Sequence, residues 1–355
     1  MSQTDNAPRQ ADSSANKPEE STVASKPEQE IAESKPTSEA GSRKTSANKA
    51  QAGSKGSKRN ILKYVLGGVV TTCILAFAFV KLGRMLIQPI VSTVKPALIS
   101  LLSPLFDEAG ASYLLIYFNF AYLWIIVVLA MVLVKPWRPF LKAIGTKPSG
   151  NTPKMLVIGL GIGLLLNTSC IFIAFLAGNI KGFELSAFEP IQIAMFLVAI
   201  LIQSSLEELI MRCFAYQRIL RVYRPAVAII ATSVIFAALH LTNEGITLTA
   251  FLSIVASGIV LALAVYYLNS FWMAAGIHTG WNFCQGVLFG LPNSGNATGY
   301  AIFRPVGEVT GSIAYDPVFG VEGTTFAIIV LAIAAAAIIY WGKKHPRPKF
   351  NVDTD

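Results

Sequence analysis

Of the 355 residues in the chain, 53% are hydrophobic and only 14% are charged, and the formal net charge is +9. Soluble domains carry about 25% charged residues, so this composition and a mean hydropathy of +0.55 exclude an ordinary soluble domain. The sequence indicates an integral membrane protein.

The first segment, residues 1–60, is rich in Ser, Ala, Lys, Glu and Pro and almost free of large apolar side chains. Such a segment buries too little apolar surface to offset its chain entropy, so we expect a disordered, polar cytoplasmic tail. We interpret it as a solvated extension; tethering of a partner or of anionic lipid is the alternative.

Apolar segments of the length that crosses a bilayer follow this tail. A span needs about twenty predominantly apolar residues, and by this rule we predict about eight transmembrane helices. They occupy residues 61–80, 113–134, 155–178, 190–209, 226–241, 246–268, 271–290 and 324–341. Residues 85–106 are apolar but contain three prolines, and we expect them to be interfacial or re-entrant. The predicted fold is an all-α, polytopic membrane helix bundle.

The predicted organisation has four parts. The tail of residues 1–60 precedes N-terminal transmembrane and interfacial segments in residues 61–150. Residues 151–342 form a transmembrane core that carries the motifs described below, and residues 343–355 form a short basic cytoplasmic tail.

Charged residues divide between alternating loops. The basic ones gather in the second loop, after the fourth span and at the C-terminal end, and the acidic ones gather in the other loops. The basic set is Lys135, Arg138, Lys142, Lys147, Lys154, Arg212, Arg218, Arg221, Arg224, Lys343, Lys344, Arg347 and Lys349. The positive-inside rule then predicts a multi-pass protein of the cell membrane with both termini in the cytoplasm.

The four cysteines, Cys73, Cys170, Cys213 and Cys284, lie in or beside apolar runs, and none forms a CxxC pair. They predict neither a disulfide framework nor a thiolate metal site. We expect them to be small apolar packing residues.

Two adjacent carboxylates, Glu207 and Glu208, end the fourth span, and Arg212 follows in an EExxxR pattern. On a helix, Glu208 and Arg212 share a face and can pair. Glu207 points about 100° away and remains available for another contact. The Glu208–Arg212 pair alone could simply fix a helix end at the membrane surface.

Two further patterns place histidines within apolar spans. Phe236 and His240 form FxxxH, and His278 and Asn282 form HxxxN. The third histidine, His345, lies in the basic tail. A single buried histidine is commonly a satisfied core residue, but ionisable groups within spans are expensive and mark functional sites. Two such histidines together with a free glutamate favour a functional site.

These residue types suit hydrolysis of an amide bond inside the membrane. A buried carboxylate beside a histidine can hold and deprotonate a water, while a second histidine and an asparagine amide can donate to an oxyanion. Glu207, His240 and His278 could equally bind zinc and leave one position open for water. Their spacing does not match HExxH, and both the metal-free and the zinc mechanism stay open.

The three motifs follow one another in this order on successive predicted spans, together with the stretch FWMAAGIHTGWNFCQGVLFGLPNSG. In these features the chain resembles the CPBP family of intramembrane proteases, which contains the CAAX prenyl proteases of type II and the bacteriocin-processing (Abi) proteins. The resemblance covers about residues 191–294. It implies a CPBP/Abi-like catalytic core.

The resemblance also implies roles for the motif residues. It makes Glu207 the general base, with His240 helping to activate the water, and it makes His278 and Asn282 oxyanion donors. Glu208 and Arg212 become a pair that positions the substrate or the catalytic helix. Members of the family have been described as metalloproteases, and a metal-free glutamate mechanism fits the same residues.

We therefore predict an intramembrane endopeptidase, with or without zinc, whose partners are the lipid bilayer and a peptide or protein substrate at the membrane, not nucleic acid. The substrate can be prenylated or a signal peptide. The main alternative is a non-catalytic binding or bacteriocin-immunity module on the same fold. A haem protein with His240 and His278 as axial ligands, or an ion pathway lined by Glu207, are further alternatives.

Overall fold

The computed structural model describes residues 43–297 and 299–354 of the chain, with side-chain surroundings from residue 68 onward. The tail expected at residues 1–60 lies outside the described residues up to residue 42. From Arg43 the chain is helical. The residues that begin this helix include Ala, Lys, Arg and Gln, all of which have high intrinsic helix propensity.

Helices make up nearly all of the regular structure in the described residues. In chain order the elements are α1 (Arg43–Leu102), α2 (Glu108–Phe118), α3 (Phe120–Leu133), the 3-10 helix η1 (Lys135–Ile144), α4 (Pro153–Leu176), β1 (Phe183–Leu185), α5 (Pro190–Glu208), the π-helix η2 (Leu209–Ala215), α6 (Tyr216–Leu220), α7 (Pro225–Leu239), α8 (Leu248–Leu268), α9 (Phe271–Asn282), the π-helix η3 (Phe283–Leu288), β2 (Phe303–Pro305), the 3-10 helix η4 (Val321–Gly323) and α10 (Thr325–Lys344). The two short strands pair antiparallel. The predicted all-α bundle is confirmed.

Hydroxyl side chains start several of these helices. Thr152 accepts from the backbone of Met155 at the start of α4, and Ser270 accepts from Met273 at the start of α9. Thr247 and Thr324 cap α8 and α10 in the same way. Each hydroxyl satisfies one of the backbone N–H groups that a helix leaves unpaired at its first turn.

Within the described residues, six helices are long and apolar enough to cross a membrane. They are Gly68–Leu102, Glu108–Leu133, Pro153–Leu176, Pro190–Leu220, Leu248–Leu268 and Thr325–Lys344. Two predicted spans are not among them: residues 226–241 overlap the 15-residue α7, and residues 271–290 contain α9, which continues as the π-helix η3 to Leu288. The polar loops that follow α7 and η3 end the helices earlier than hydropathy suggests.

The segment expected to be interfacial or re-entrant, residues 85–106, differs from that expectation. Helix α1 continues through Pro89 and Pro96 and ends at Leu102. The hydroxyls of Ser92 and Thr93 donate to the carbonyl of Pro89 within this stretch. Proline is more frequent in membrane helices than in soluble ones, and α1 accommodates two without ending.

Large apolar side chains remain exposed on the outward faces of the spans. Leu133 on α3 is 72% exposed and Leu176 on α4 is 67% exposed, and α1 and α10 carry others. Soluble monomers rarely expose contiguous apolar patches larger than a few hundred Å². These faces are therefore the lipid-facing surface of a multi-pass membrane protein.

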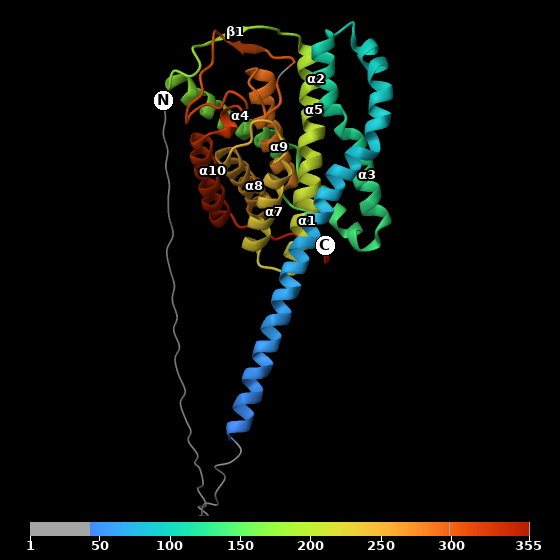
Figure 1. The fold of residues 1–355 in the computed structure, drawn as a ribbon, viewed down its shortest axis with the longest axis vertical. Coiled ribbons are helices and arrows are strands. Elements are labelled where there is room, and N and C mark those ends of the chain that lie inside the picture. Colours follow the sequence, from blue (N-terminus) through green and yellow to red (C-terminus); the bar gives the residue numbers. More distant parts are fainter. Residues whose placement is uncertain (1–42, 298, 355) are drawn as a thin grey trace, which may run out of the picture. The chain divides into compact units, whose positions relative to one another are not determined.

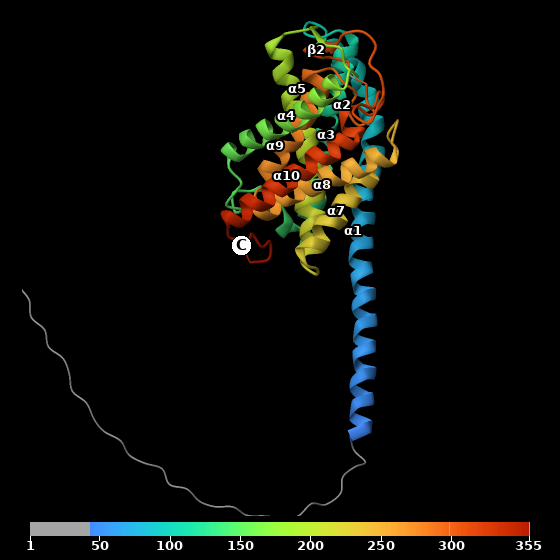
Figure 2. The same ribbon diagram turned by 90° about the vertical axis from the view of Figure 1, so that its left-hand side faces the viewer.

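Figures 1 and 2 show α9 inside the bundle, between α4, α5 and α8. Helices α2 and α3 pack on the other side of α5, and α7 and α10 both pack against α8. All residues of α9 except Trp272 are buried. The two helices that carry EExxxR and HxxxN are thus direct neighbours.

Glycines allow α9 to approach α4 closely. Gly276 and Gly280 of α9 lie against the backbone of α4, and Gly159 and Gly163 of α4 lie against the backbone of α9. Small residues at such spacing let membrane helices pack with their backbones in near contact. This contact fixes the position of His278, which stands between the two glycines of α9.

Replacing Gly163 by Ala is expected to destabilise the bundle by about 1–3 kcal/mol, the usual cost of overpacking. A Cβ at this position would meet the carbonyl oxygen of Ile277 and lie 2.8 Å from the backbone nitrogen of Trp281. Thermal unfolding in detergent measures the loss. Gly161→Ala is the matched control, because a Cβ there has no neighbour within 4 Å. Equal stability of the two variants would contradict this packing.

Candidate active site

The helix that carries the glutamates is longer than its hydropathy suggests. It runs without a break from Pro190 to Leu220 and changes to π-helical geometry directly after Glu208. Helix α9 changes in the same way directly after Asn282. Single π-helical turns inside α-helices occur frequently at functional sites. The geometry thus changes immediately after Glu208 in one helix and immediately after Asn282 in the other.

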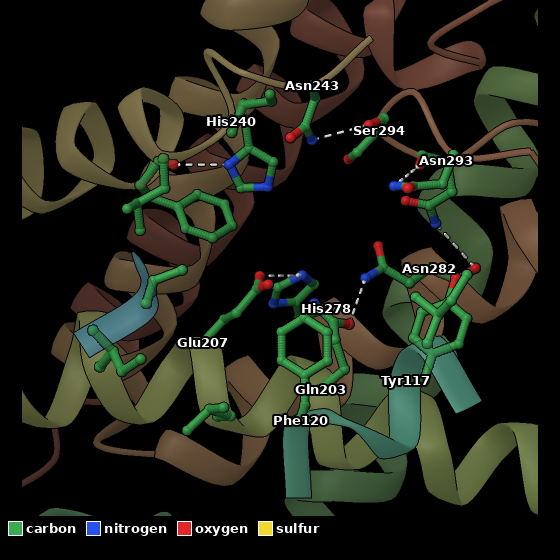
Figure 3. A pocket seen from close by; sticks show the side chains of 18 of the residues that line it. Tyr117, Phe120, Gln203, Glu207, His240, Asn243, His278, Asn282, Asn293 and Ser294 are labelled. Atoms are coloured by element: carbon green, nitrogen blue, oxygen red, sulfur yellow. Dashed lines mark hydrogen bonds and ion pairs between the residues drawn. The ribbon is translucent and has the colours of Figure 1, made fainter. Parts of the chain in front are cut away.

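A cavity of about 370 Å³ collects the residues that the motifs single out. Glu207 of α5, His240 at the end of α7, and His278 and Asn282 of α9 all line it. Figure 3 shows these four side chains around one open space. The continuous helix Pro190–Leu220, which carries Glu207, reaches the same cavity as His240. Counting residues along the predicted spans alone places these two side chains near opposite sides of the membrane.

A chain of charged and polar contacts leads from Arg212 to Glu207. The Nε of Arg212 lies 3.1 Å from Oε2 of Glu208, and its Nη2 donates to the carbonyl of Gly258 over 2.9 Å. The Nδ1 of His278 donates to Oε1 of Glu208 over 3.0 Å, and its Nε2 lies 3.7 Å from Oε2 of Glu207. Glu208 therefore bridges Arg212 and His278, and His278 stands between the two carboxylates.

Glu208 and Arg212 act from behind the cavity. Both side chains are completely buried, and neither lines the cavity. A buried ion pair is tolerated only where its geometry is good and further hydrogen bonds satisfy it. The pair holds the orientation of His278 without touching a molecule in the cavity.

The aromatic residue of FxxxH, Phe236, packs between the other motif residues. Its ring centroid lies 4.9 Å from that of His240 and 5.8 Å from that of His278, both edge-on. The guanidinium of Arg212 lies 5.2 Å from the same centroid. Edge-on aromatic pairs and cation–π contacts are favourable geometries. One ring therefore orients both imidazoles and the arginine.

The backbone fixes the orientation of His240. Its Nδ1 donates to the carbonyl of Phe236 over 2.9 Å, which leaves Nε2 free to meet a molecule in the cavity. Asn282 is held by a side chain, because its Nδ2 donates to Oε1 of Gln203 over 3.1 Å. One amide hydrogen of Asn282 remains for a further acceptor.

The cavity residues that lie outside the three motifs and were not predicted include two polar side chains, Gln203 and Glu322. Gln203 stands one helical turn before Glu207, and its place as a polar residue in an apolar run is the signal that could have found it. Glu322 of η4 lines the opposite wall. It comes from a loop far away in the sequence, so only the fold places it here.

Glu322 holds the turn that closes this wall. Its Oε1 accepts from the hydroxyl of Ser294 over 2.7 Å and also from the backbone N–H of Ser294, and its Oε2 accepts from Nε1 of Trp281 over 3.1 Å. Burial raises the pKa of Glu322 above its ordinary 4.5, and the hydrogen bonds from Ser294 and Trp281 offset part of that rise.

A raised pKa of Glu322 predicts a loss of stability as pH rises. Its contribution is fully present below about pH 4.5, the unfolded value, and is lost as pH rises through the higher folded value. Glu322→Gln removes this pH-dependent loss, at the cost of one acceptor at every pH. Unfolding free energies between about pH 4 and 8 test this. Glu308→Gln, at an exposed loop position, is the control and keeps the wild-type profile.

The residues considered as zinc ligands do not form a metal-binding group. No set of three or more His, Cys, Asp or Glu side chains in the part of the chain that the structure describes has that arrangement. All four cysteines are free.

Comparison with known proteins gives one family match. Residues 189–284 match the model of the family described as "Type II CAAX prenyl endopeptidase Rce1-like". The matched region contains Glu207, His240, His278 and Asn282 and confirms the resemblance to the CPBP family over these residues. No curated protein and no solved structure matches the chain significantly. The match supports a CAAX-type intramembrane endopeptidase in general, and the six candidate spans support a multi-pass membrane protein.

Proposed function

We propose, starting from the match of residues 189–284 to a family of prenyl endopeptidases, that the chain hydrolyses peptide bonds within the membrane with Glu207 as general base. The observation that carries this proposal is the state of the Glu207 carboxylate. Its Oε2 is buried and has no hydrogen-bond partner, and the side chain lines the cavity. A buried polar atom without a partner is rare and calls for an explanation. A bound water supplies that partner.

The reaction begins with this water. Glu207 takes one of its protons, and the oxygen forms a bond to the carbonyl carbon of the scissile peptide. His240, whose Nε2 is free, accepts a hydrogen bond from the second O–H of the water and orients it. When the carbon–nitrogen bond breaks, Glu207 gives its proton to the leaving amine. No nucleophilic serine or cysteine takes part, and no step passes through a metal.

The oxyanion is stabilised from α9. The remaining amide hydrogen of Asn282 and the Nε2–H of a protonated His278 donate to it. Glu208 accepts the hydrogen bond from Nδ1 of this imidazole, and Arg212 pairs with Glu208 in its buried site. Glu208 and Arg212 are positioning residues in this scheme.

The substrate is a membrane-associated peptide or protein, such as a prenylated chain or a signal peptide. Apolar side chains of α1 and α2 line the same cavity as the catalytic residues, among them Ile87, Val91 and Ile116. An apolar segment that lies in the bilayer therefore reaches Glu207 between these helices. The polar opposite wall, with Asn293 and Ser294, receives the backbone of the peptide.

The test compares new peptide termini in cells that produce the wild-type chain with those in cells that produce the Glu207→Gln chain at the same level. The exchange keeps the size of the side chain and removes the base. A defined set of cleavages that is lost in the variant identifies both the activity and its substrates. Identical termini in the two cell lines, with correct membrane insertion, would overturn the proposal in favour of a binding role.

A further inference from the structure

A second cavity, of about 490 Å³, lies apart from the catalytic one. The α6 region, the turn between α8 and α9, and the C-terminal residues Lys349–Asp353 line it together. The charges of the neighbouring loops predict that this end of the bundle faces the cytoplasm. None of the residues that line it lines the catalytic cavity.

Two buried side chains that line this cavity, Arg212 and Tyr216, each have a polar atom without a hydrogen-bond partner. Arg212 is completely buried and Tyr216 is 2% exposed, and both line the cavity. The Nη1 of Arg212 and the hydroxyl of Tyr216 have no hydrogen-bond partner. Leaving buried donors unsatisfied costs about 1–3 kcal/mol each, and more for a charged group. Two such donors on one cavity point to a ligand that accepts hydrogen bonds.

Two more cations line the same cavity. Arg221 and Lys349 belong to its lining, and the Nε of Arg221 donates to Oδ2 of Asp353 over 2.9 Å. This pair is partly exposed, with 28% of the Arg221 side chain and 49% of the Asp353 side chain accessible. A carboxylate of the C-terminal segment thus already occupies part of the positive surface. The arrangement suits an anion that can compete with Asp353.

We propose that this cavity binds a phosphate-type oxyanion, supplied either as free phosphate or as the headgroup of an anionic lipid. A phosphate group offers several acceptor oxygens, and arginine donors match their geometry well. One oxygen accepts from Arg212 and Tyr216 at the buried side, and others accept from Arg221 and Lys349. Arg212 also holds Glu208, so the bound anion contacts the residue that anchors the catalytic side chains.

The experiment measures phosphate binding to the purified full-length chain in detergent, by thermal shift and by calorimetry at constant ionic strength. Tyr216→Phe keeps the ring but removes one donor to a charged group and is expected to weaken binding about tenfold. Asp353→Asn removes the competing carboxylate and is expected to strengthen binding about two- to fivefold. Arg224→Gln, an exposed arginine outside the cavity, is the control and binds as the wild type does.

Weaker phosphate binding by Tyr216→Phe together with stronger phosphate binding by Asp353→Asn supports the proposed site. The proposal is overturned if wild-type protein does not respond to phosphate, which makes the cavity a water site, or if all variants respond equally, which makes the effect general screening. Nanodiscs separate the two sources. If phosphatidylglycerol, in place of phosphatidylcholine, abolishes the response to added phosphate, the ligand is a lipid headgroup; a response in both lipids supports free phosphate.

Discussion

Replacing Glu207 by Gln is expected to lower the rate of peptide hydrolysis by about 10²–10⁴-fold, the usual contribution of a general base. Glutamine fills the same space and can still orient a water, but it cannot take a proton at neutral pH. Because the side chain is partly accessible from the cavity and its Oε2 has no hydrogen-bond partner, the exchange breaks no hydrogen bond of that oxygen. We therefore expect a fall in kcat at nearly unchanged stability.

The measurement is the initial rate of cleavage of an identified substrate by purified chain in liposomes. Glu189→Gln is the matched control, since this glutamate precedes the same helix, is exposed and does not line the cavity. It should cleave at the wild-type rate. A Glu207→Gln protein that retains more than about a tenth of the activity would contradict the assignment of the general base.

The second large effect concerns stability. Arg212→Met is expected to destabilise the fold by about 3–5 kcal/mol, because it leaves the carboxylate of Glu208 buried without its ion partner. Both side chains of the pair are completely buried, so water cannot take the place of the arginine. The loss also affects His278, whose Nδ1 depends on the same carboxylate.

A double-mutant cycle isolates this cause. Glu208→Gln on the Arg212→Met background removes the uncompensated charge, so part of the lost stability should return. Unfolding in mixed micelles measures the three variants. If the two single losses simply add in the double variant, the arginine contributes through packing against Phe236 and not through the charge of Glu208.

Contacts that depend on residue spacing within one helix could be predicted from the sequence. The four-residue separation of Glu208 and Arg212 predicted their pairing, and the offset of Glu207 predicted a side chain free to face another element. Both contacts depend only on helical geometry. The apolar runs predicted most of the helices for the same reason.

Contacts between segments that are far apart in the sequence could not be predicted from helical spacing. Glu322 reaches the cavity from a loop that follows the matched region by many residues, and nothing local distinguishes it from an ordinary surface acid. The continuity of α1 through Pro89 and Pro96 could not be predicted either, because proline usually ends or kinks a helix. Likewise, hydropathy did not predict that the helix carrying Glu207 continues to Leu220, nor that Glu207 and His240 line one cavity.

The shortness of α7 has a consequence for the surrounding bilayer. Its 15 residues rise only about 22 Å, which is less than the roughly 30 Å of a hydrocarbon core. Lipids accommodate such a mismatch by thinning locally, which lowers the headgroups toward the polar loop after His240. Solvent then travels a shorter distance from the aqueous phase to the catalytic carboxylate. Under the proposed hydrolysis, this thinning brings water closer to Glu207.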